Sequence, residues 1–139
     1  MEVIANLLQT VPVSQNVQFT DTVVCGNCSI IHRDGSGLVT VKGTTNQCRA
    51  RYRISFGGNI AVPTAETVGP ISLAIAIEGE AIAATTMTVT PTVVDAFFNV
   101  SSSVFIDVPR GCCINISVRN VSNIPVDVQN ANLTVERVA

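Results

Sequence analysis

The chain has 139 residues, of which 47% are hydrophobic, 13% charged and 4% aromatic, with no tryptophan and a net charge of −2. This length is typical of one domain. The charged fraction is about half of the ~25% usual in soluble domains, and the slight negative charge gives no electrostatic basis for binding nucleic acid. Polar residues interrupt every apolar run before it reaches the ~20 residues of a spanning helix, so no membrane partner is predicted. We expect a β-protein that hides part of its surface by self-association.

Residues 1–14 (MEVIANLLQTVPVS) carry no charge after Glu2. Pro12 prevents a helix or strand from continuing through the segment. No basic region precedes its apolar residues, so it is not a secretory signal peptide, and synthesis in the cytoplasm is expected. Two interpretations remain open: a docking arm, or the first strand of the domain that occupies residues 15–139. The apolar residues that an arm would use are Ile4, Leu7, Leu8 and Val11.

From residue 17 onward the pattern is that of β-strands separated by turns. Short segments at residues 17–19, 29–33 and 38–42 are rich in apolar and β-branched residues, and each is predicted to be a strand. The sequence Asp34-Gly35-Ser36-Gly37 is typical of a hairpin turn. Later strands are predicted at residues 104–108, 114–118 and 132–138. Eight to ten short strands with a turn about every ten residues indicate a β-sandwich or jelly roll.

Residues 48–56 (CRARYRISF) alternate most clearly. Side chains of a strand point alternately to its two faces. The face predicted to be buried carries Cys48, Ala50, Tyr52, Ile54 and Phe56. The sequence Gly57-Gly58-Asn59 that follows is predicted to break or bulge the strand.

The opposite face of this strand carries three arginines, Arg49, Arg51 and Arg53. Seven of the eight basic residues of the chain are arginine, which is favoured in interfaces because its planar guanidinium pairs bidentately and is weakly hydrated. We predict that these three arginines contribute to an interface between copies of the chain. A compositional bias of the source lineage is the alternative explanation for the preference.

The segment 71–78 (ISLAIAIE) has large apolar side chains on one face and small ones on the other. A strand facing water would carry charge on its second face. Because Ala74 and Ala76 stand there instead, this face is predicted to be covered, by a neighbouring sheet or by another subunit. The two alanines are therefore further candidates for the interface.

The order of the segments CRARYRISFGGNIA, ISLAIAIEGEAIA, TTMTVTP and FFNVSSSVFIDVPRGCCINISVRN resembles the ten-stranded jelly roll of the complement-subcomponent globular head and the tumour necrosis factor superfamily. The resemblance runs over residues 17–138. It is closest to small bacterial and bacteriophage members, such as the heads of spore-surface collagen-like glycoproteins, although no Gly-x-y stalk precedes it. The resemblance implies an all-β jelly-roll sandwich that forms a compact homotrimer. It also implies that the strand pair VFIDVPRGCCINISV forms the centre of a sheet.

Catalysis has no support in the sequence. His32 is the only histidine and is expected to be a surface or interface residue, since no nucleophile-elbow motif accompanies it. The Gly35-Ser36-Gly37 sequence belongs to a hairpin and not to a phosphate-binding turn. Glu78 and Glu80 flank a turn and are expected to face solvent. We predict that the protein is not an enzyme and uses no cofactor.

Five cysteines are the only chemically suggestive set. Cys25 and Cys28 form a C-x-x-C sequence, a spacing that zinc sites use, but the second ligand pair of such a site is missing. Cys48 and Cys112 share parity with core residues and are predicted to be buried thiols. Three states remain open: buried structural thiols, one disulfide such as Cys25–Cys28, or a metal site at these two residues. The odd count favours a reducing compartment of synthesis.

The expected function is that of a trimeric accessory protein on a particle surface, such as a bacteriophage virion decoration, head-fibre or tail-associated protein. The expected partners are other copies of the chain and a capsid, tail or surface-layer protein, and the expected location is a virion or a bacterial surface particle. The alternative is an adhesive head that binds a host receptor or glycan on a phage fibre or on a spore or cell surface. The absence of an aromatic-rich loop for stacking on sugars favours the first function.

Overall fold

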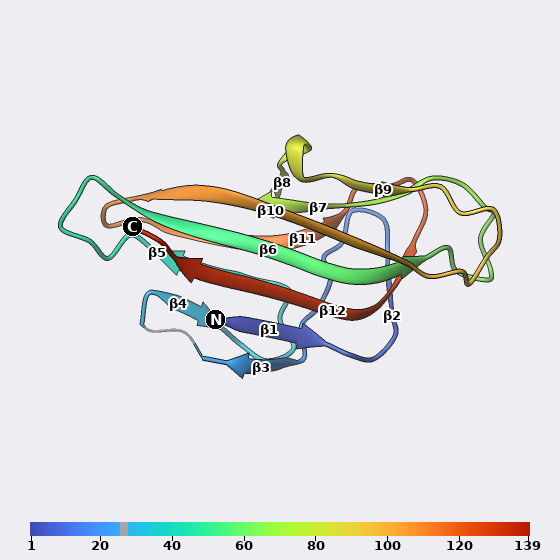
Figure 1. The fold of residues 1–139 in the computed structure, drawn as a ribbon, viewed down its shortest axis with the longest axis horizontal. Helices are drawn as coiled ribbons and strands as arrows, with labels where there is room; N and C mark the ends of the chain where they lie inside the picture. The colour runs from blue at the N-terminus through green and yellow to red at the C-terminus, as the bar shows by residue number, and fades with distance from the viewer. Residues whose placement is uncertain (26–27) are drawn as a thin grey trace.

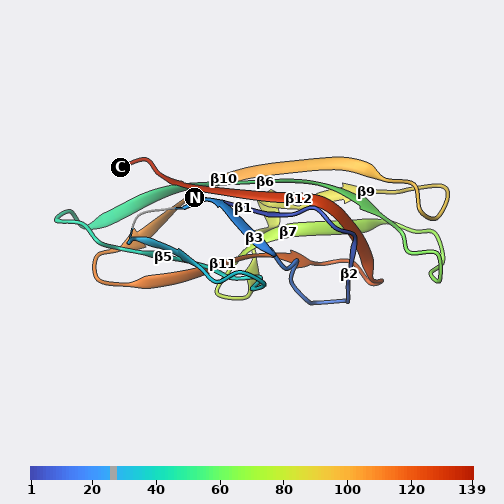
Figure 2. The same ribbon diagram turned by 90° about the horizontal axis from the view of Figure 1, so that it is seen from below.

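The structure, a computed structural model, describes residues 1–25 and 28–139 as two antiparallel β-sheets packed face to face (Figure 1, Figure 2). Sheet A has the order β10-β6-β12-β1-β3, with β2 also on β12, and sheet B has the order β4-β5-β11-β7-β8, with β9 also on β7. This confirms the predicted all-β jelly-roll sandwich. No helix in the described ranges is long and apolar enough to cross a membrane.

The strands have the following bounds. Sheet A consists of β1 (Glu2–Ala5), β2 (Gln9–Val11), β3 (Asp21–Val24), β6 (Arg49–Ala61), β10 (Phe98–Pro109) and β12 (Val126–Arg137). Sheet B consists of β4 (Ile30–His32), β5 (Val39–Lys42), β7 (Ile71–Ile77), β8 (Glu80–Ala81), β9 (Met87–Val89) and β11 (Cys113–Asn120). A single 3-10 turn in the described part of the chain, η1 (Ala83–Thr85), lies between β8 and β9.

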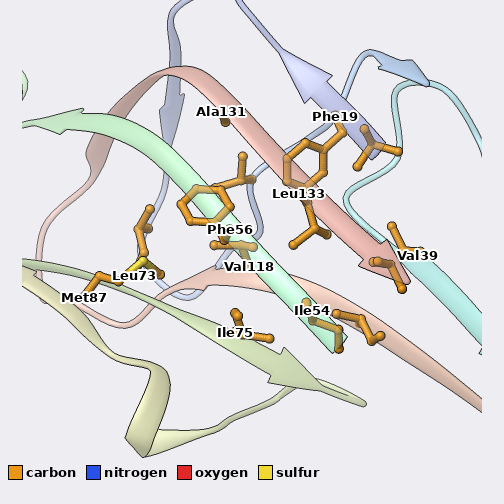
Figure 3. Packing of buried hydrophobic residues seen from close by; sticks show 14 of the residues in the cluster. Phe19, Val39, Ile54, Phe56, Leu73, Ile75, Met87, Val118, Ala131 and Leu133 are labelled. Atoms are coloured by element: carbon orange, nitrogen blue, oxygen red, sulfur yellow. The ribbon is translucent and has the colours of Figure 1, made fainter. Parts of the chain in front are cut away.

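The inward faces of both sheets meet in one apolar core (Figure 3). Phe56 and Leu133 of sheet A and Leu73 and Ile75 of sheet B are all buried there. Fully burying a side chain of this size contributes about 1.5–3 kcal/mol. Tyr52 is also buried, and its hydroxyl donates a 2.6 Å hydrogen bond to the Lys42 carbonyl. The core therefore depends on the alternation that the sequence predicts for β6 and β7.

The glycines of β6 do not break the strand as predicted. β6 continues through Gly57 and Gly58 to Ala61, and the irregularity lies instead in its partner β12, between Gln129 and Asn132. A Cβ atom on Gly58 would come within 3.3 Å of the Ala131 Cα atom. The absence of a side chain at Gly58 thus allows the bulge of β12 to approach β6 closely.

The resemblance implied that β10 and β11 form a pair at the centre of one sheet. In the structure they do not pair. β10 is the edge strand of sheet A, whereas β11 lies inside sheet B between β5 and β7. The turn between Pro109 and Cys113 carries the chain from one sheet to the other, with Gly111 at a φ of +79°. Each of the two strands therefore contributes one face to the shared core.

Residues 1–14 take the second of the two predicted forms, because they build strands of sheet A. β1 lies between β12 and β3, and Val3 and Val11 are buried in the core. Ile4 lies half-buried, while Leu7 and Leu8, between β1 and β2, are 82% and 54% exposed. Burial of Val11 removes it from the residues available to a docking arm.

The strand predicted at residues 17–19 is not formed, because no strand lies in the described residues between β2 and β3. Val17 and Phe19 are buried, and the Val17 N–H donates to the Val118 carbonyl at 2.8 Å. Apolar alternation therefore marked core positions correctly, although the segment does not pair continuously with a neighbouring strand.

The role of the N-terminal segment is tested by a matched pair of substitutions. Val3→Asp puts an unpaired charge in the core, and we expect it to remove several kcal/mol of the about 5–15 kcal/mol that a domain has. Leu7→Asp, at an exposed site between β1 and β2, should change the free energy of unfolding by less than about 0.5 kcal/mol. Urea unfolding followed by circular dichroism measures both, and equal stability of the two variants would contradict the position of β1 in the sheet.

Candidate functional site: the outer face of sheet A

The three arginines predicted for an interface lie together on the outer face of sheet A. Arg49, Arg51 and Arg53 alternate along β6 with buried residues, and their side chains are 56%, 41% and 51% exposed. Across the strand pair, Arg51 stands opposite Asp107 and Arg53 opposite Phe105. Opposed residues of an antiparallel pair share a face, so this surface combines side chains of β6 and β10.

One carboxylate orders two of these arginines. The Arg51 Nε and NH2 groups donate to the two oxygens of Asp107 at 2.8 and 3.1 Å, and the Arg49 Nε atom lies 3.1 Å from Asp107 Oδ2. The hydrogen bond from Arg51 is the main cause that lowers the pKa of Asp107. Exposed ion pairs contribute little to stability. Their effect here is to hold the guanidinium groups in fixed orientations.

The rest of the face is flat and built from small side chains. Ser55 of β6 faces Ser103 of β10 and Thr134 of β12. Phe105, which stands opposite Arg53 and two residues along β10 from Ser103, is 61% exposed. A shallow groove of about 390 Å³ beside it is lined by Arg53, Ser55, Phe56, Ser101, Ser102 and Ser103. An exposed aromatic residue next to a groove, with ordered arginines around it, is typical of a protein–protein contact surface.

Ala74 and Ala76 do not belong to this surface. Both are fully buried within a single chain on the outer side of sheet B, as is Ser117 opposite Ala76. Arg119, which stands opposite Ala74, donates from its guanidinium to the Gly79 carbonyl at 2.7 Å. The predicted covering of this face is therefore supplied by the chain itself. The two alanines have no surface to offer a second copy, and their assignment to an interface is corrected.

The cysteines are not buried, which corrects the prediction for Cys48 and Cys112. All five cysteines are exposed free thiols, so Cys25 and Cys28 form no disulfide. Cys48 precedes the first residue of β6, and Cys112 lies in the turn after β10. The alternation of apolar residues in the sequence extends to Cys48 and Cys112, but neither residue belongs to a strand, so the pattern predicted burial wrongly. Within the described residues, no group of three or more potential ligands is placed to hold a metal ion.

His32 is also placed differently from its prediction as a surface or interface residue, because its side chain is fully buried. Its Nε2 atom lies 3.0 Å from the Ser36 carbonyl and its Nδ1 atom 2.9 Å from the Thr22 hydroxyl. The hydroxyl of Thr22 donates to Asp34 at 2.9 Å. In a catalytic triad a carboxylate orients the histidine through the nitrogen that does not face the nucleophile. Here the Ser36 carbonyl, and not a carboxylate, is the partner of the His32 Nε2 atom. The contacts of His32 therefore hold the turn between β4 and β5 in place.

Comparison with known structures relates this arrangement to two proteins. The globular domain of the zebrafish complement 1qA protein superposes with a TM-score of 0.71 over 99% of this chain and 95% of its own, at 13% identity. Murine APRIL superposes with a TM-score of 0.58 over 98% of this chain and 99% of its own, at 14% identity. The fold is the complement-head and tumour-necrosis-factor jelly roll. No protein-family model and no curated sequence matches the chain.

The pairing of Asp107 with Arg49 and Arg51 can be tested by the dependence of stability on pH. Its pKa is lowered in the folded protein, so its contribution to stability is present above the unfolded value of about 3.9 and is lost as the pH falls through the lower folded value. We expect the melting temperature of the native protein to fall more between pH 7 and pH 3 than that of Asp107→Asn. Glu136→Gln, which removes a single 3.7 Å contact with Arg53, is the control and should retain the native pH profile. An identical profile for Asp107→Asn would contradict the pairing.

Proposed function

We propose that the protein is a non-enzymatic homotrimeric head that assembles through the outer face of sheet A. The observation that carries the proposal is Phe105, which is 61% exposed on the outer face of the edge strand β10, opposite Arg53 and two residues along the strand from Ser103. Burial of such a ring removes apolar area from water, at about 25 cal/mol per Å². Arg49 and Arg51, already held by Asp107, lose little further freedom when a second copy packs against them.

Three further considerations support a closed trimer. The charges of the proposed contact are paired within the chain, Asp107 with Arg49 and Arg51 and Glu136 with Arg53, so contact between copies buries these groups as ion pairs and not as single ions. Soluble self-associating proteins form closed symmetric rings as a rule, because open arrangements produce filaments. The sequence resembles the jelly roll of the complement head and the tumour necrosis factor superfamily, and that resemblance implies a homotrimer.

We further propose that the trimer is an accessory protein of a particle surface, a decoration, head-fibre or tail-associated protein of a bacteriophage virion or a component of a bacterial surface particle. A capsid, tail or surface-layer protein is the proposed carrier. The support is the resemblance to small bacterial and bacteriophage heads, together with a site that offers contact surface and no catalytic arrangement.

A second candidate function, adhesion to a host receptor or glycan, is favoured by the end of the sandwich formed by the loops 62–70 and 90–97. The two loops lie side by side in both views (Figure 1, Figure 2), and the Asp95 N–H donates to the Val62 carbonyl at 2.9 Å. Val93, Phe97 and Phe98 are 57%, 39% and 42% exposed there. Phe97 and Phe98 are adjacent in the sequence, and their exposure together with that of Val93 gives this end an apolar surface that can contact a partner.

Light scattering tests the trimer. We expect the native protein at micromolar concentration to show three times the chain mass of 14.6 kDa. Phe105→Asp should shift the mass toward that of one chain without loss of folding, because it puts a charge at the centre of the contact. Val93→Asp, which changes a similarly exposed apolar residue (57% against 61%) in the loop 90–97, is the matched control and should remain trimeric. A native protein of single-chain mass would overturn the proposal.

The two candidate roles of the trimer are separated by a binding comparison. Fluorescently labelled native protein is compared with the double variant Phe97→Ser, Phe98→Ser for co-sedimentation with purified particles and for binding to host cells. An accessory protein co-sediments with particles in both forms. Cell binding that the double variant loses would instead establish the adhesive function.

A further inference from the structure

His32 is a buried titratable residue that the proposed trimer does not use. It is the only histidine of the chain, and its side chain is fully buried. Histidine is the residue that ordinarily changes charge between about pH 5 and pH 8. The contacts of a buried histidine ring therefore determine which of its two charge states the surrounding structure accommodates.

The ring lies where the two sheets meet at one edge of the sandwich. β4, which carries His32, is the edge strand of sheet B, and β3, which carries Thr22, is the edge strand of sheet A. His32 stands opposite the buried Val39 of β5, and Thr22 stands opposite the buried Val3 of β1. Opposed residues share a face, so both side chains point toward the interior. The 2.9 Å contact between the His32 Nδ1 atom and the Thr22 hydroxyl therefore joins sheet A to sheet B.

The Nε2 atom of the ring must carry a proton. It lies 3.0 Å from the Ser36 carbonyl oxygen, which can only accept a hydrogen bond. Ser36 belongs to the turn between β4 and β5, and two backbone hydrogen bonds tie this turn to the segment before β3. The Gly35 N–H donates to the Phe19 carbonyl at 2.8 Å, and the Phe19 N–H donates to the Ser36 carbonyl at 3.2 Å. The turn thus holds a fixed acceptor against Nε2.

The Nδ1 atom shares the Thr22 hydroxyl with Asp34. The Thr22 Oγ1 atom lies 2.9 Å from the His32 Nδ1 atom and 2.9 Å from a carboxylate oxygen of Asp34. An ionised carboxylate only accepts, and a hydroxyl has one proton to donate. When Thr22 donates to Asp34, its oxygen can meet Nδ1 only as an acceptor, so Nδ1 must carry a proton as well. Both contacts are hydrogen bonds at the same time only when the ring is the imidazolium ion.

A neutral ring leaves one of these two contacts without a proton. With its single proton on Nε2, the ring presents an unprotonated Nδ1 atom to Thr22. The hydroxyl then donates either to Nδ1 or to Asp34, and the other contact brings two acceptors to 2.9 Å. Two facing acceptors repel each other, so that contact opens. Loss of the proton therefore removes one hydrogen bond between β3 and sheet B.

The carboxylate of Asp34 balances the charge of the imidazolium ion. One of its oxygens lies 3.8 Å from Nδ1, and its side chain is 67% exposed. A groove of about 440 Å³ lies beside the ring. Among the described residues that line it, the other titratable groups are the Met1 amino group and the Cys25 thiol. The amino group donates to the Val135 carbonyl at 2.7 Å.

The remaining charged residues of the adjoining elements stand at outward or exposed positions. They are Glu2 of β1, Asp21 of β3, Arg33 of the turn and Lys42 of β5. Each of the three strand residues alternates with a neighbour that points inward. The carboxylate on the turn is therefore the one that faces the ring.

We propose that His32, Thr22 and Asp34 form a proton-dependent clamp that holds β3 against sheet B. In the protonated form both ring nitrogens donate, Nε2 to the Ser36 carbonyl and Nδ1 to Thr22, while Thr22 donates to Asp34. As the pH rises, Nδ1 releases its proton to solvent, one hydrogen bond is lost and β3 loosens. On sheet A, β3 has β1 as its one neighbour in the described strand order, so the clamp is its main second attachment. The inference goes beyond the proposed trimer and does not depend on it.

Nitrogen-15 chemical shifts of the His32 ring test the two charge states directly, because a protein labelled at histidine gives the signals of one ring. We expect both nitrogens to be protonated at pH 5 and Nε2 alone at pH 8. A ring that is neutral at pH 5 would overturn the inference. A neutral form that carries its proton on Nδ1 would overturn it as well.

Hydrogen exchange tests the effect on β3. Deuterium uptake of residues 21–24 is measured at pH 5 and pH 8 and corrected for the intrinsic exchange rate at each pH. The net contribution of one hydrogen bond corresponds to about a fivefold change in an opening equilibrium, so the protection of β3 should be about fivefold lower at pH 8. Residues 98–109 of β10, on the face proposed for the trimer, should keep their protection in the same sample. An equal fall in both segments, or no fall in β3, would contradict a local clamp.

A matched pair of substitutions separates the clamp from other effects of pH. Thr22→Val changes the hydroxyl to a methyl group, and its β3 should show the same low protection at both pH values. Thr40→Val is the control, because the Thr40 hydroxyl donates at 2.7 Å to Asn115, a side chain that does not titrate. The control should retain the fivefold fall of the native protein. A fivefold fall in Thr22→Val would overturn the inference.

Asp34→Asn is the decisive variant. An amide donates as well as accepts, so with a neutral ring the amide donates to Thr22 and Thr22 donates to Nδ1. With a charged ring the direction reverses, and the amide oxygen accepts. The β3 of this variant should therefore be as protected at pH 8 as that of the native protein at pH 5. Low protection at pH 8 would overturn the inference.

The outcome for Asp34→Asn decides the matter even where Thr22→Val fails to fold. The Asp34 side chain is 67% exposed, and substitutions at exposed sites change stability little. The mass of the variant is confirmed after exchange, because the new amide precedes Gly35 and is prone to deamidation.

Discussion

The pairing of β6 with β10 is the constraint on which the rest of the structure depends. The two strands pair without a register shift from Arg49 opposite Pro109 to Ile60 opposite Phe98. Side chains alternate along both strands, so a slip of one residue would exchange the two faces. The same register therefore puts Tyr52 and Ile106 into the core and leaves Phe105 outside.

This constraint links stability to assembly. The residues of β6 and β10 that point inward stabilise the core by their burial. The residues that alternate with them form the outer face, so the same register determines which side chains that face carries. Small side chains such as Ser55 and Ser103 keep that face flat, and Asp107 holds two arginines in place. Preorganised groups lose less entropy on association. The outer face is thus suited to contact with another copy, although its ion pairs add little to the stability of one chain.

Local alternation was sufficient to predict the strands β6 and β7 and the two faces of each, because burial of one face follows directly from period-two spacing. It failed where the outcome depends on a partner distant in sequence. Gly58 tolerates a bulge that lies in β12, and Arg119 of β11 extends over the face that carries Ala74. It also failed at Cys48, where the apolar pattern continues beyond the end of the sheet. The N-terminal segment was ambiguous because pairing of β1 with β12 is a contact between the two ends of the chain.

The two ends of the sandwich differ in chemistry. One end carries the thiols of Cys48 and Cys112, just beyond β6 and β10. At the other end, the loops 62–70 and 90–97 carry exposed apolar residues and no basic residue, since none occurs between Arg53 and Arg110. In the adhesive alternative proposed above, contact with a receptor is left to the second end.

The claim that sheet A faces the axis of a trimer is tested most directly by distances between spin labels. In the cysteine-free background, one cysteine replaces Ser103 on the outer face of sheet A, or Thr88 on the outer face of sheet B. Electron double resonance then measures the separation between copies. The account predicts a single short distance at position 103 and a much longer one at position 88. A shorter distance at position 88, or no coupling between copies at either position, would contradict it.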